Sequence, residues 1–313
     1  MDQRTNELFR HWRQKPNIHC FAHKAMATIF EIFIEDSDKE KSQYAAFEAF
    51  KLLDLLEIDL SRFIENSDVN RINKLEMGQE TIVSPETFEC LQISTDIFLL
   101  TQGCFDITAG ALVDKWRKKY KEGIPLVYDE IERLAHTLGK KHFELDSKRF
   151  AVRKISGHKV ELDLGGIGKG FAVDKMSELL QEWDIHSAFI HGGQSSIFAL
   201  GAPSFQSEGW PVSLIPPGNG PSTLDKICLK NASISGSGLL KGEHILDLRT
   251  LQPVAAKSAS WVVAPNAALS DALSTAFLIL DSDEIKRVCE DQKEISALIL
   301  KEEKTEKFGN YFN

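Results

Sequence analysis

The stretch that most constrains the fold is residues 160–174, which read VELDLGGIGKGFAVD. Val160, Leu162 and Leu164 alternate with acidic residues, and this period of two predicts a half-buried strand. Four glycines follow, and an apolar pattern with helical spacing starts among them. Because glycine has no Cβ atom, such a turn lets a ligand approach the backbone, and it can adopt conformations closed to other residues. The free N–H groups of a helix start, with Lys169 beside them, suit a phosphate group.

The glycine turn differs from both common phosphate-binding motifs. A P-loop requires a glycine six positions before the lysine and a serine or threonine after it, whereas Asp163 and Gly170 stand there. The dinucleotide-binding motif G-x-G-x-x-G also fails, because Gly166, Gly168 and Gly170 are spaced G-x-G-x-G. A tight turn that binds no ligand is therefore the alternative interpretation.

The composition is that of a globular protein with one large or two modest domains. The chain has 313 residues, of which 42% are hydrophobic and 27% charged, so it can bury a core. A formal net charge of -9 argues against a general nucleic-acid surface, which needs clustered lysine and arginine. The basic run at 115–121, KWRKKYK, is interpreted as a solvated helix end.

Cysteine use and hydropathy bear on the compartment. Five cysteines are an odd number, and no two have C-x-x-C spacing, so neither a disulfide framework nor a zinc site is expected. No apolar run reaches the roughly 18 residues of a membrane span, and the first residues do not read as a secretory leader. We expect a cytoplasmic protein, or a periplasmic or membrane-attached one only if a leader has been removed.

Periodicity predicts strands and helices in a mixed order, which favours an α+β fold. After a polar lead-in at 1–20, strands are predicted at 25–34, 142–154 (two strands around a turn), 160–164, 187–191, 196–200, 211–215, 227–234, 244–247, 260–264 and 296–301. Helices are predicted at 44–63, 84–102, 109–121, after the glycine turn, at 270–280 and at 283–290. We expect a single domain over 1–313 without a clear internal boundary. Its mixed β-sheets would be flanked by helices in two intimately packed lobes with a cleft between them.

Three further segments carry candidate chemistry. Asp271 and Thr275 lie four residues apart on one predicted helical face, and hard oxygen ligands of this kind suit Mg²⁺. The alternative is that Asp271 only caps its own helix while Thr275 packs inward. His244 lies three residues before Asp247 and could carry a proton near neutral pH, although a lone histidine is often structural. Asp106, after the glycine at 103, could be no more than a turn former.

Taken in order, these segments resemble the ApbE family of FAD:protein FMN transferases. The segment 163–174 is similar to the family's DLGGIAKGYAVD, and 270–276 is similar to its ADALATA helix; these two are the specific matches. Weaker likenesses are at 25–28 to MGT, at 60–73 to S-x-Y…S…N, at 105–108 to FDxT, at 233–236 to a serine-glycine turn, and at 244–254 to HIIDPRTGxPV.

The resemblance implies a magnesium site formed by the Gly168 carbonyl with Asp271 and Thr275, and it implies His244 and Lys169 as catalytic residues. The implied FAD cleft is lined by Met26, Phe63, Cys104, Phe105, Asp106, Gly165, Lys169, Phe171 and Ile245. FAD would be the substrate, and FMN would pass to a threonine or serine of an acceptor protein with release of AMP. The implied acceptor is a flavin-carrying subunit of a membrane redox complex, and the acceptor motif is absent from this chain.

Several positions depart from the family pattern. Ala27 replaces the glycine of MGT, Phe63 replaces a tyrosine, and Leu248 and Leu251 replace the proline and glycine of DPRTG. Gln194-Ser195 and Ser237-Gly238-Leu239 also stand where the family usually has acidic or aromatic residues. Two alternatives to a transferase therefore stay open: an FAD-binding protein that has lost transfer activity, and a magnesium-dependent FAD diphosphatase that yields FMN and AMP.

Overall fold

The computed structural model describes residues 11–124, 127–216, 223–238, 245–254, 257–301 and 304–312. Its centre is an eight-stranded sheet in the order β1-β2-β6-β7-β10-β13-β14-β15, and all its ladders are antiparallel. The strands are β1 (Ile18–Ala25), β2 (Thr28–Glu35), β6 (Ala188–Gly192), β7 (Ser196–Leu200), β10 (Ala232–Gly238), β13 (Ala259–Ala264), β14 (Ser296–Lys301) and β15 (Lys304–Phe308).

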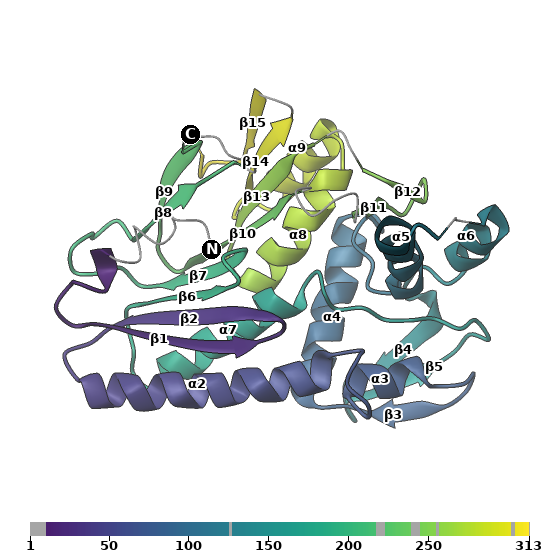
Figure 1. Cartoon of the computed structure of the whole chain (residues 1–313), viewed down its shortest axis with the longest axis horizontal. Coiled ribbons are helices and arrows are strands. Elements are labelled where there is room, and N and C mark those ends of the chain that lie inside the picture. Colours follow the sequence, from purple (N-terminus) through teal and green to yellow (C-terminus); the bar gives the residue numbers. More distant parts are fainter. Residues whose placement is uncertain are drawn as a thin grey trace.

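The sheet separates two hydrophobic cores. Along β2, Phe30, Ile32 and Ile34 point into one core, whereas Phe33 points into the other, because successive side chains of a strand alternate between faces. The larger core lies under three helices, α2 (Lys39–Leu60), α7 (Gly168–Glu182) and α8 (Ala267–Ile279), which lie side by side along the sheet (Figure 1). The smaller core is covered by Trp12 and by the ribbon of β8 (Trp210–Leu214) and β9 (Asp225–Leu229).

The rest of the described chain forms a smaller lobe beside the three helices (Figure 1). A three-stranded sheet in the order β3-β5-β4 lies at its base, and a short β11–β12 hairpin lies near α5. The elements are α3 (Asp68–Asn73), β3 (Glu80–Ile82), α4 (Pro85–Leu100), α5 (Gly110–Glu122), α6 (Tyr128–Ala135), the 3₁₀ turn η1 (Lys140–His142), β4 (Phe143–Asp146), β5 (Ala151–Lys154), β11 (Leu246–Asp247) and β12 (Gln252–Pro253). α9 (Ser282–Asp291) packs on β14 and β15.

The predicted α+β class is confirmed, and β7 has the predicted bounds. Helix starts follow local capping: Ser84 accepts a hydrogen bond from the Thr87 N–H at the start of α4, and Asp281 forms a capping box with Glu284 at the start of α9. No helix of the described residues combines the length and the apolar composition that a bilayer crossing requires.

Several predicted elements are wrong in detail. The buried Trp12 and the first three residues of β1 lie inside the segment expected to be a polar lead-in, and β15 lies in the segment expected to be a tail. The strand predicted at 227–234 is two strands, because Asn231 adopts a φ of 49° and turns the chain. The serine-glycine turn expected at 233–236 is part of β10.

The strand predicted at 160–164 is also wrong. The predicted alternation is present, since Val160, Leu162 and Leu164 are buried. The described residues nevertheless form no ladder here beyond a single parallel bridge between Ala109 and Glu161. Other groups hold this segment, as described below.

The β1–β2 hairpin closes through a strained two-residue turn. Met26 and Ala27 have φ values of 49° and 58° and join the register pair Ala25 and Thr28. Two consecutive residues with positive φ form the turn that best matches the twist of a hairpin, and glycine or asparagine normally occupies it. Without a glycine, each residue costs roughly 1–2 kcal/mol.

We expect Ala27→Gly to stabilise the protein by about 0.5–1 kcal/mol, because glycine adopts this conformation without steric cost. The matched control is Ala22→Gly at an exposed position inside β1, which should destabilise by about 0.5–1 kcal/mol. Urea denaturation of the two variants measures both effects. Destabilisation of both variants to the same extent would contradict the assignment of strain to the turn.

Candidate functional site

Two helices, α7 and α8, cap each other at their N-termini. The Asp174 carboxylate of α7 accepts hydrogen bonds from the Ala267 and Ala268 N–H groups at 2.6 and 2.8 Å, in the first turn of α8. In return, the Asp271 carboxylate of α8 accepts one from the Gly170 N–H at 3.0 Å, in the first turn of α7. No side chain of the cap residue itself caps α7. Each helix start is therefore satisfied by a carboxylate of the other helix.

Close packing explains the glycine at position 170. A Cβ atom there would lie 2.1 Å from the Ala267 carbonyl oxygen and 2.8 Å from the Asp271 Cβ, so any side chain would push α7 and α8 apart. None of the glycines at 165, 166, 168 and 170 has the positive φ that the sequence interpretation allowed for. A Cβ at Gly168 would meet nothing within 4 Å, so the start of α7 faces open space at this residue.

The paired helix starts bring Lys169 and Asp271 together. The Lys169 Nζ lies 3.2 Å from the Asp271 Oδ2 and 3.5 Å from its Oδ1. The Asp271 side chain is 5% exposed and that of Lys169 is 24% exposed, so the carboxylate is inside the protein while the ammonium reaches the surface. A buried carboxylate needs a cation or hydrogen-bond donors, and here it has both.

Hydroxyl groups continue the polar surface beside Asp271. Ser237 of β10 lies 3.2 Å, Oγ to Oγ1, from Thr275, and its Oγ is 2.8 Å from the Ser274 Oγ. Ser233, Ser235 and Ser237 occur at alternate positions of β10 and all contact the α8 segment, which explains why this strand carries so many serines.

The donor set fits a hard divalent cation. Asp271 and Thr275 present carboxylate and hydroxyl oxygens, which Mg²⁺ prefers, and the Lys169 ammonium already shows that a positive charge is stabilised beside Asp271. The described residues contain no cluster of three or more His, Cys, Asp or Glu side chains placed to hold a metal. The alternative that Asp271 caps α8 is wrong, because Asn266 is the cap residue of that helix.

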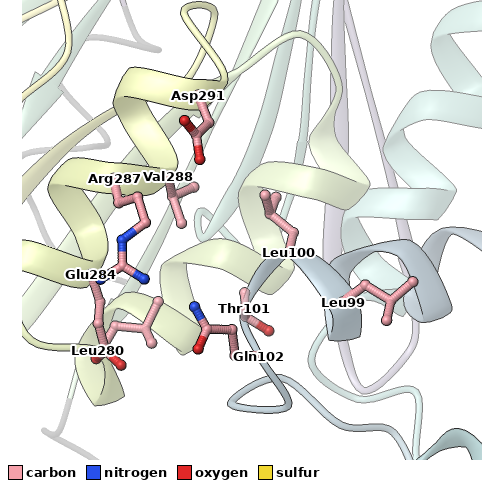
Figure 2. Close-up of a pocket in the computed structure, with 9 residues that line it drawn as sticks. All are labelled: Leu99, Leu100, Thr101, Gln102, Leu280, Glu284, Arg287, Val288 and Asp291. Atoms are coloured by element: carbon pink, nitrogen blue, oxygen red, sulfur yellow. The ribbon is translucent and has the colours of Figure 1, made fainter.

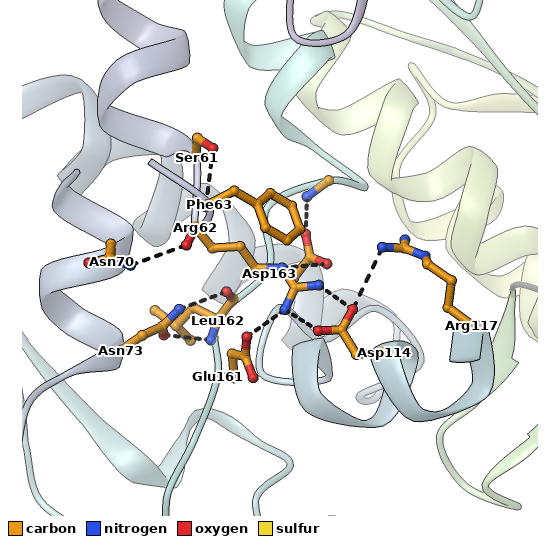
Figure 3. Close-up of polar contacts among 11 residues, drawn as sticks. Ser61, Arg62, Phe63, Asn70, Asn73, Asp114, Arg117, Glu161, Leu162 and Asp163 are labelled. Carbon is orange, nitrogen blue, oxygen red and sulfur yellow. Dashed lines mark hydrogen bonds and ion pairs between the residues drawn. The ribbon is translucent and has the colours of Figure 1, made fainter. Parts of the chain in front are cut away.

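The chain that leads into the glycine turn is held by side chains and by one backbone hydrogen bond. The Asn73 amide forms two hydrogen bonds with the Leu162 backbone, at 2.7 Å to its N–H and 3.1 Å to its carbonyl (Figure 3). The Asp163 N–H donates to the Ile107 carbonyl at 2.7 Å. These contacts replace the ladder hydrogen bonds that a regular strand would make.

Arg62 is the second anchor of this segment. Its buried guanidinium contacts Asp114 at 2.6 and 2.9 Å and Glu161 at 2.6 Å, and its Nε lies 3.3 Å from the Asp163 carboxylate (Figure 3). It also lies 4.6 Å from the ring centre of Phe63. Because one cation holds three carboxylates, Arg62 joins α5 and the approach to the glycine turn to the end of α2.

The remaining predicted site residues have different environments. Phe63 is 75% exposed, and Met26 is at the tip of the β1–β2 turn. Cys104 is buried, and burial raises the pKa of its thiol to about 11, so the thiol stays neutral at pH 7. His244 lies outside the described residues, and its neighbour Ile245 is buried.

Asp106 acts within the fold as a turn former. Its carboxylate accepts hydrogen bonds from the Thr108 N–H at 2.8 Å and from the Gly139 N–H at 2.7 Å, and burial raises its pKa. Phe105 lies against the glycine turn, because a Cβ at Gly166 would be 3.2 Å from its ring. Phe171 is 1% exposed, so its side chain offers almost no surface to a ligand.

Two pockets are separate from these residues. One, of about 100 Å³, lies between the end of α4 and α9, where Arg287 and Asp291 line it (Figure 2). The other, of about 420 Å³, lies between α9 and β15. Neither contains a predicted site residue. The candidate site is therefore defined by the polar groups that converge at the starts of α7 and α8.

Sequence reasoning missed Asp174, Ser237 and Arg62 as parts of this arrangement. Asp174 ends the glycine segment and has no local capping pattern, because its partners are 93 and 94 residues away. Ser237 stands out in the sequence only as a departure from the family pattern. Arg62 had no signal beyond its place beside Phe63.

Comparisons with known proteins point to one family. A model of the ApbE family matches residues 26–299. A FAD:protein FMN transferase of Buchnera aphidicola is 29% identical over 273 residues, covering 79% of this chain and 76% of that protein. One from Klebsiella pneumoniae is 24% identical over 298 residues, with coverages of 89% and 83%.

Solved structures agree with this assignment. The ApbE protein of Thermotoga maritima has a TM-score of 0.80 at 26% identity and covers 93% of this chain and 97% of its own. The flavin transferase ApbE of Vibrio cholerae has a TM-score of 0.82 at 20% identity, with coverages of 94% and 98%. At that identity the second likeness shows the fold alone.

Asp174→Asn is expected to change how stability depends on pH. Burial raises the pKa of the Asp174 carboxyl to about 7, against about 3.9 in an unfolded chain. Between these two pKa values the Asp174 carboxyl keeps its proton in the folded protein and has released it in the unfolded chain. The resulting stabilisation is complete below about pH 4 and is lost as the pH rises through 7.

The measurement is urea denaturation of wild type and Asp174→Asn at several pH values. We expect the difference in unfolding free energy between wild type and Asp174→Asn to shrink between about pH 4.5 and 7.5. The reason is that Asp174 titrates over this range and asparagine does not. An advantage that stays constant over this range would contradict the raised pKa.

Proposed function

The chain belongs to the ApbE family, and from this membership and the geometry of the site we propose that it transfers FMN from FAD to an acceptor protein. The acceptor group is a threonine or serine hydroxyl, and AMP is released. The observation that carries the proposal is the contact of Lys169 with Asp271 at the start of α7, with the Thr275 hydroxyl four residues further along α8. Cationic and hard-oxygen groups beside a helix N-terminus are what a diphosphate and its counter-ion require.

The proposed diphosphate site is the start of α7. The positive end of the helix dipole and the Lys169 ammonium would bind the phosphate oxygens of FAD. Asp271, Thr275 and the Gly168 carbonyl would hold Mg²⁺. When bound, the ion would neutralise charge that develops on the leaving AMP. Lys169 would then exchange its contact with Asp271 for one with the substrate, because the two cations compete for one carboxylate.

The proposed reaction is a substitution at the phosphorus of the FMN half of FAD. The acceptor hydroxyl oxygen forms a bond to this phosphorus, and the bond to the bridging oxygen breaks, so AMP leaves with that oxygen. His244 is the proposed group that takes the hydroxyl proton. The product is an FMN phosphoester on the acceptor side chain.

The proposed flavin contacts come from the smaller lobe, the β1–β2 turn, the glycine turn and α7. Phe63 offers an exposed ring for stacking, and Arg62 below it fixes the ring position. The other proposed contacts are Met26, Cys104, Phe105, Asp106, Gly165, Phe171 and Ile245. Phe171 could contribute only as a support, because its side chain lies in the core.

The proposed acceptor is a flavin-carrying subunit of a membrane redox complex, and the proposed compartment is the cytoplasm. The free cysteines support a reducing compartment.

The direct test is to incubate the protein with FAD, Mg²⁺ and an acceptor domain that carries a threonine or serine before Gly-Ala. We expect AMP and an acceptor that is heavier by one FMN, detected by mass spectrometry. Asp271→Asn should slow the reaction at least about 100-fold, because it removes the charge that binds the cation. Free FMN and AMP without an adduct would instead show a diphosphatase, and bound but unreacted FAD would show a binding protein.

A second test asks whether Mg²⁺ binding depends on the hydroxyl group of Thr275 or only on the size of its side chain. Thr275→Ser keeps the hydroxyl, whereas Thr275→Val keeps the volume and removes it. We expect Mg²⁺ to raise the melting temperature of the FAD complex in wild type and Thr275→Ser. Thr275→Val should need about tenfold more Mg²⁺ for the same rise. Equal Mg²⁺ requirements in all three proteins would contradict the role given to this hydroxyl.

A further inference from the structure

The outer face of α2 carries an apolar stripe. Tyr44, Phe47, Leu55 and Ile58 are 55%, 58%, 59% and 49% exposed. All four lie on the side opposite the residues that α2 buries against the sheet and α7. In Figure 1, α2 runs along the lower edge of the molecule, and its outer side faces away from the other labelled elements. Large apolar side chains that gather on one face mark an interaction surface more often than scattered ones do.

The spacing of the stripe is that of a helix that pairs with another helix. Tyr44, Phe47, Lys51, Asp54 and Ile58 follow one another at intervals of three and four residues, the a and d positions of a heptad repeat. Leu55 lies beside Asp54 and widens the stripe. Apolar residues occupy both ends, and the two central positions carry one positive and one negative charge.

We propose that this stripe pairs with the same stripe of a second copy of this chain, with the two α2 helices antiparallel. In an antiparallel pair an a position of one helix faces a d position of the other. Phe47 then faces Ile58 of the second copy, and Lys51 faces Asp54. Because the two copies are related by a twofold axis, each of these contacts occurs twice. A parallel or shifted pairing would lose these contacts between opposite charges. The antiparallel pairing places Lys51 and Asp54 face to face at the centre of the interface.

The two central charges can exchange their present partners for these contacts. Lys51 now pairs with Glu48 at 3.0 Å, within its own helix, and Asp54 pairs with His23 at 2.7 Å. The Lys51 and Asp54 side chains are 57% and 50% exposed. Exposed pairs of this kind are worth about 0–1 kcal/mol, so exchanging them for contacts across the interface costs little.

The size of the stripe sets the expected strength. α2 has 22 residues and is therefore about 33 Å long. A single helix pair buries less area than the roughly 1,200–2,000 Å² of a stable complex. The dimer should accordingly be weak, with a dissociation constant on the order of 10 μM. This inference does not depend on the proposed transfer reaction.

The test is sedimentation equilibrium of the full chain from about 1 to 200 μM, concentrations that bracket the expected dissociation constant. Wild type should change from monomer to dimer over this range. Lys51→Asp and Asp54→Lys should each stay monomeric, because each places like charges opposite one another twice. The double variant should regain the dimer, and an equimolar mixture of the two single variants should form a heterodimer.

Two variants, each with one exposed leucine replaced by serine, test whether association depends on this stripe or on surface hydrophobicity in general. Leu55→Ser should weaken the dimer at least about tenfold, whereas Leu99→Ser, at a 54% exposed leucine of α4, should leave it unchanged. A wild type that stays monomeric at 200 μM would overturn the proposal. So would a double variant or a mixture that fails to restore association.

Discussion

The candidate site depends on the exchange of caps between α7 and α8. Asp174 satisfies the first turn of α8 at 2.6 and 2.8 Å, and Asp271 satisfies the first turn of α7 at 3.0 Å. This exchange is possible only because Gly170 lets the two helices touch. Because of this contact, the Asp271 carboxylate lies between the positive end of the α7 dipole and the Lys169 ammonium. The same contacts that stabilise the helix pair therefore form the place where we propose that the diphosphate and the metal ion bind.

The local part of this arrangement could be predicted from the sequence, and the long-range part could not. The helical spacing of 270–280 and the glycine segment predicted both helices, and the family resemblance predicted that Lys169, Asp271 and Thr275 act together. Lys169 does lie beside Asp271, and Ser237 links to Thr275. The strand predicted at 160–164 was wrong because this segment pairs with no neighbouring strand. The side chains of Asn73 and Arg62, about 90–100 residues away in the sequence, bind it instead. The edge strand β15 was missed because its exposed, polar residues read as loop, and most of β1 was missed because its polar and apolar residues do not alternate.

The departures from the family pattern have physical consequences in this chain. Ala27 and Leu251 stand where the family has glycine, and both keep the positive φ that a glycine would adopt, at 58° and 60°. The strain at Leu251 is offset by packing: Leu248 and Leu251 contact a buried cluster of Leu112, Trp116, Ile131 and Leu246. The two leucines therefore attach the β11–β12 hairpin to α5 and α6. Nothing in the structure explains the alanine at position 27.

The central claim of the proposal is that the Asp271 carboxylate, which caps the start of α7, exchanges a lysine for a metal ion when the substrate binds. Crystals soaked with FAD and Mn²⁺, which gives an anomalous signal that Mg²⁺ lacks, test this most directly. The account predicts an anomalous peak in contact with the Asp271 carboxylate and the Thr275 hydroxyl, with the Lys169 ammonium moved onto a phosphate oxygen. A diphosphate bound elsewhere, with Lys169 still paired to Asp271 and no peak beside it, would contradict the account.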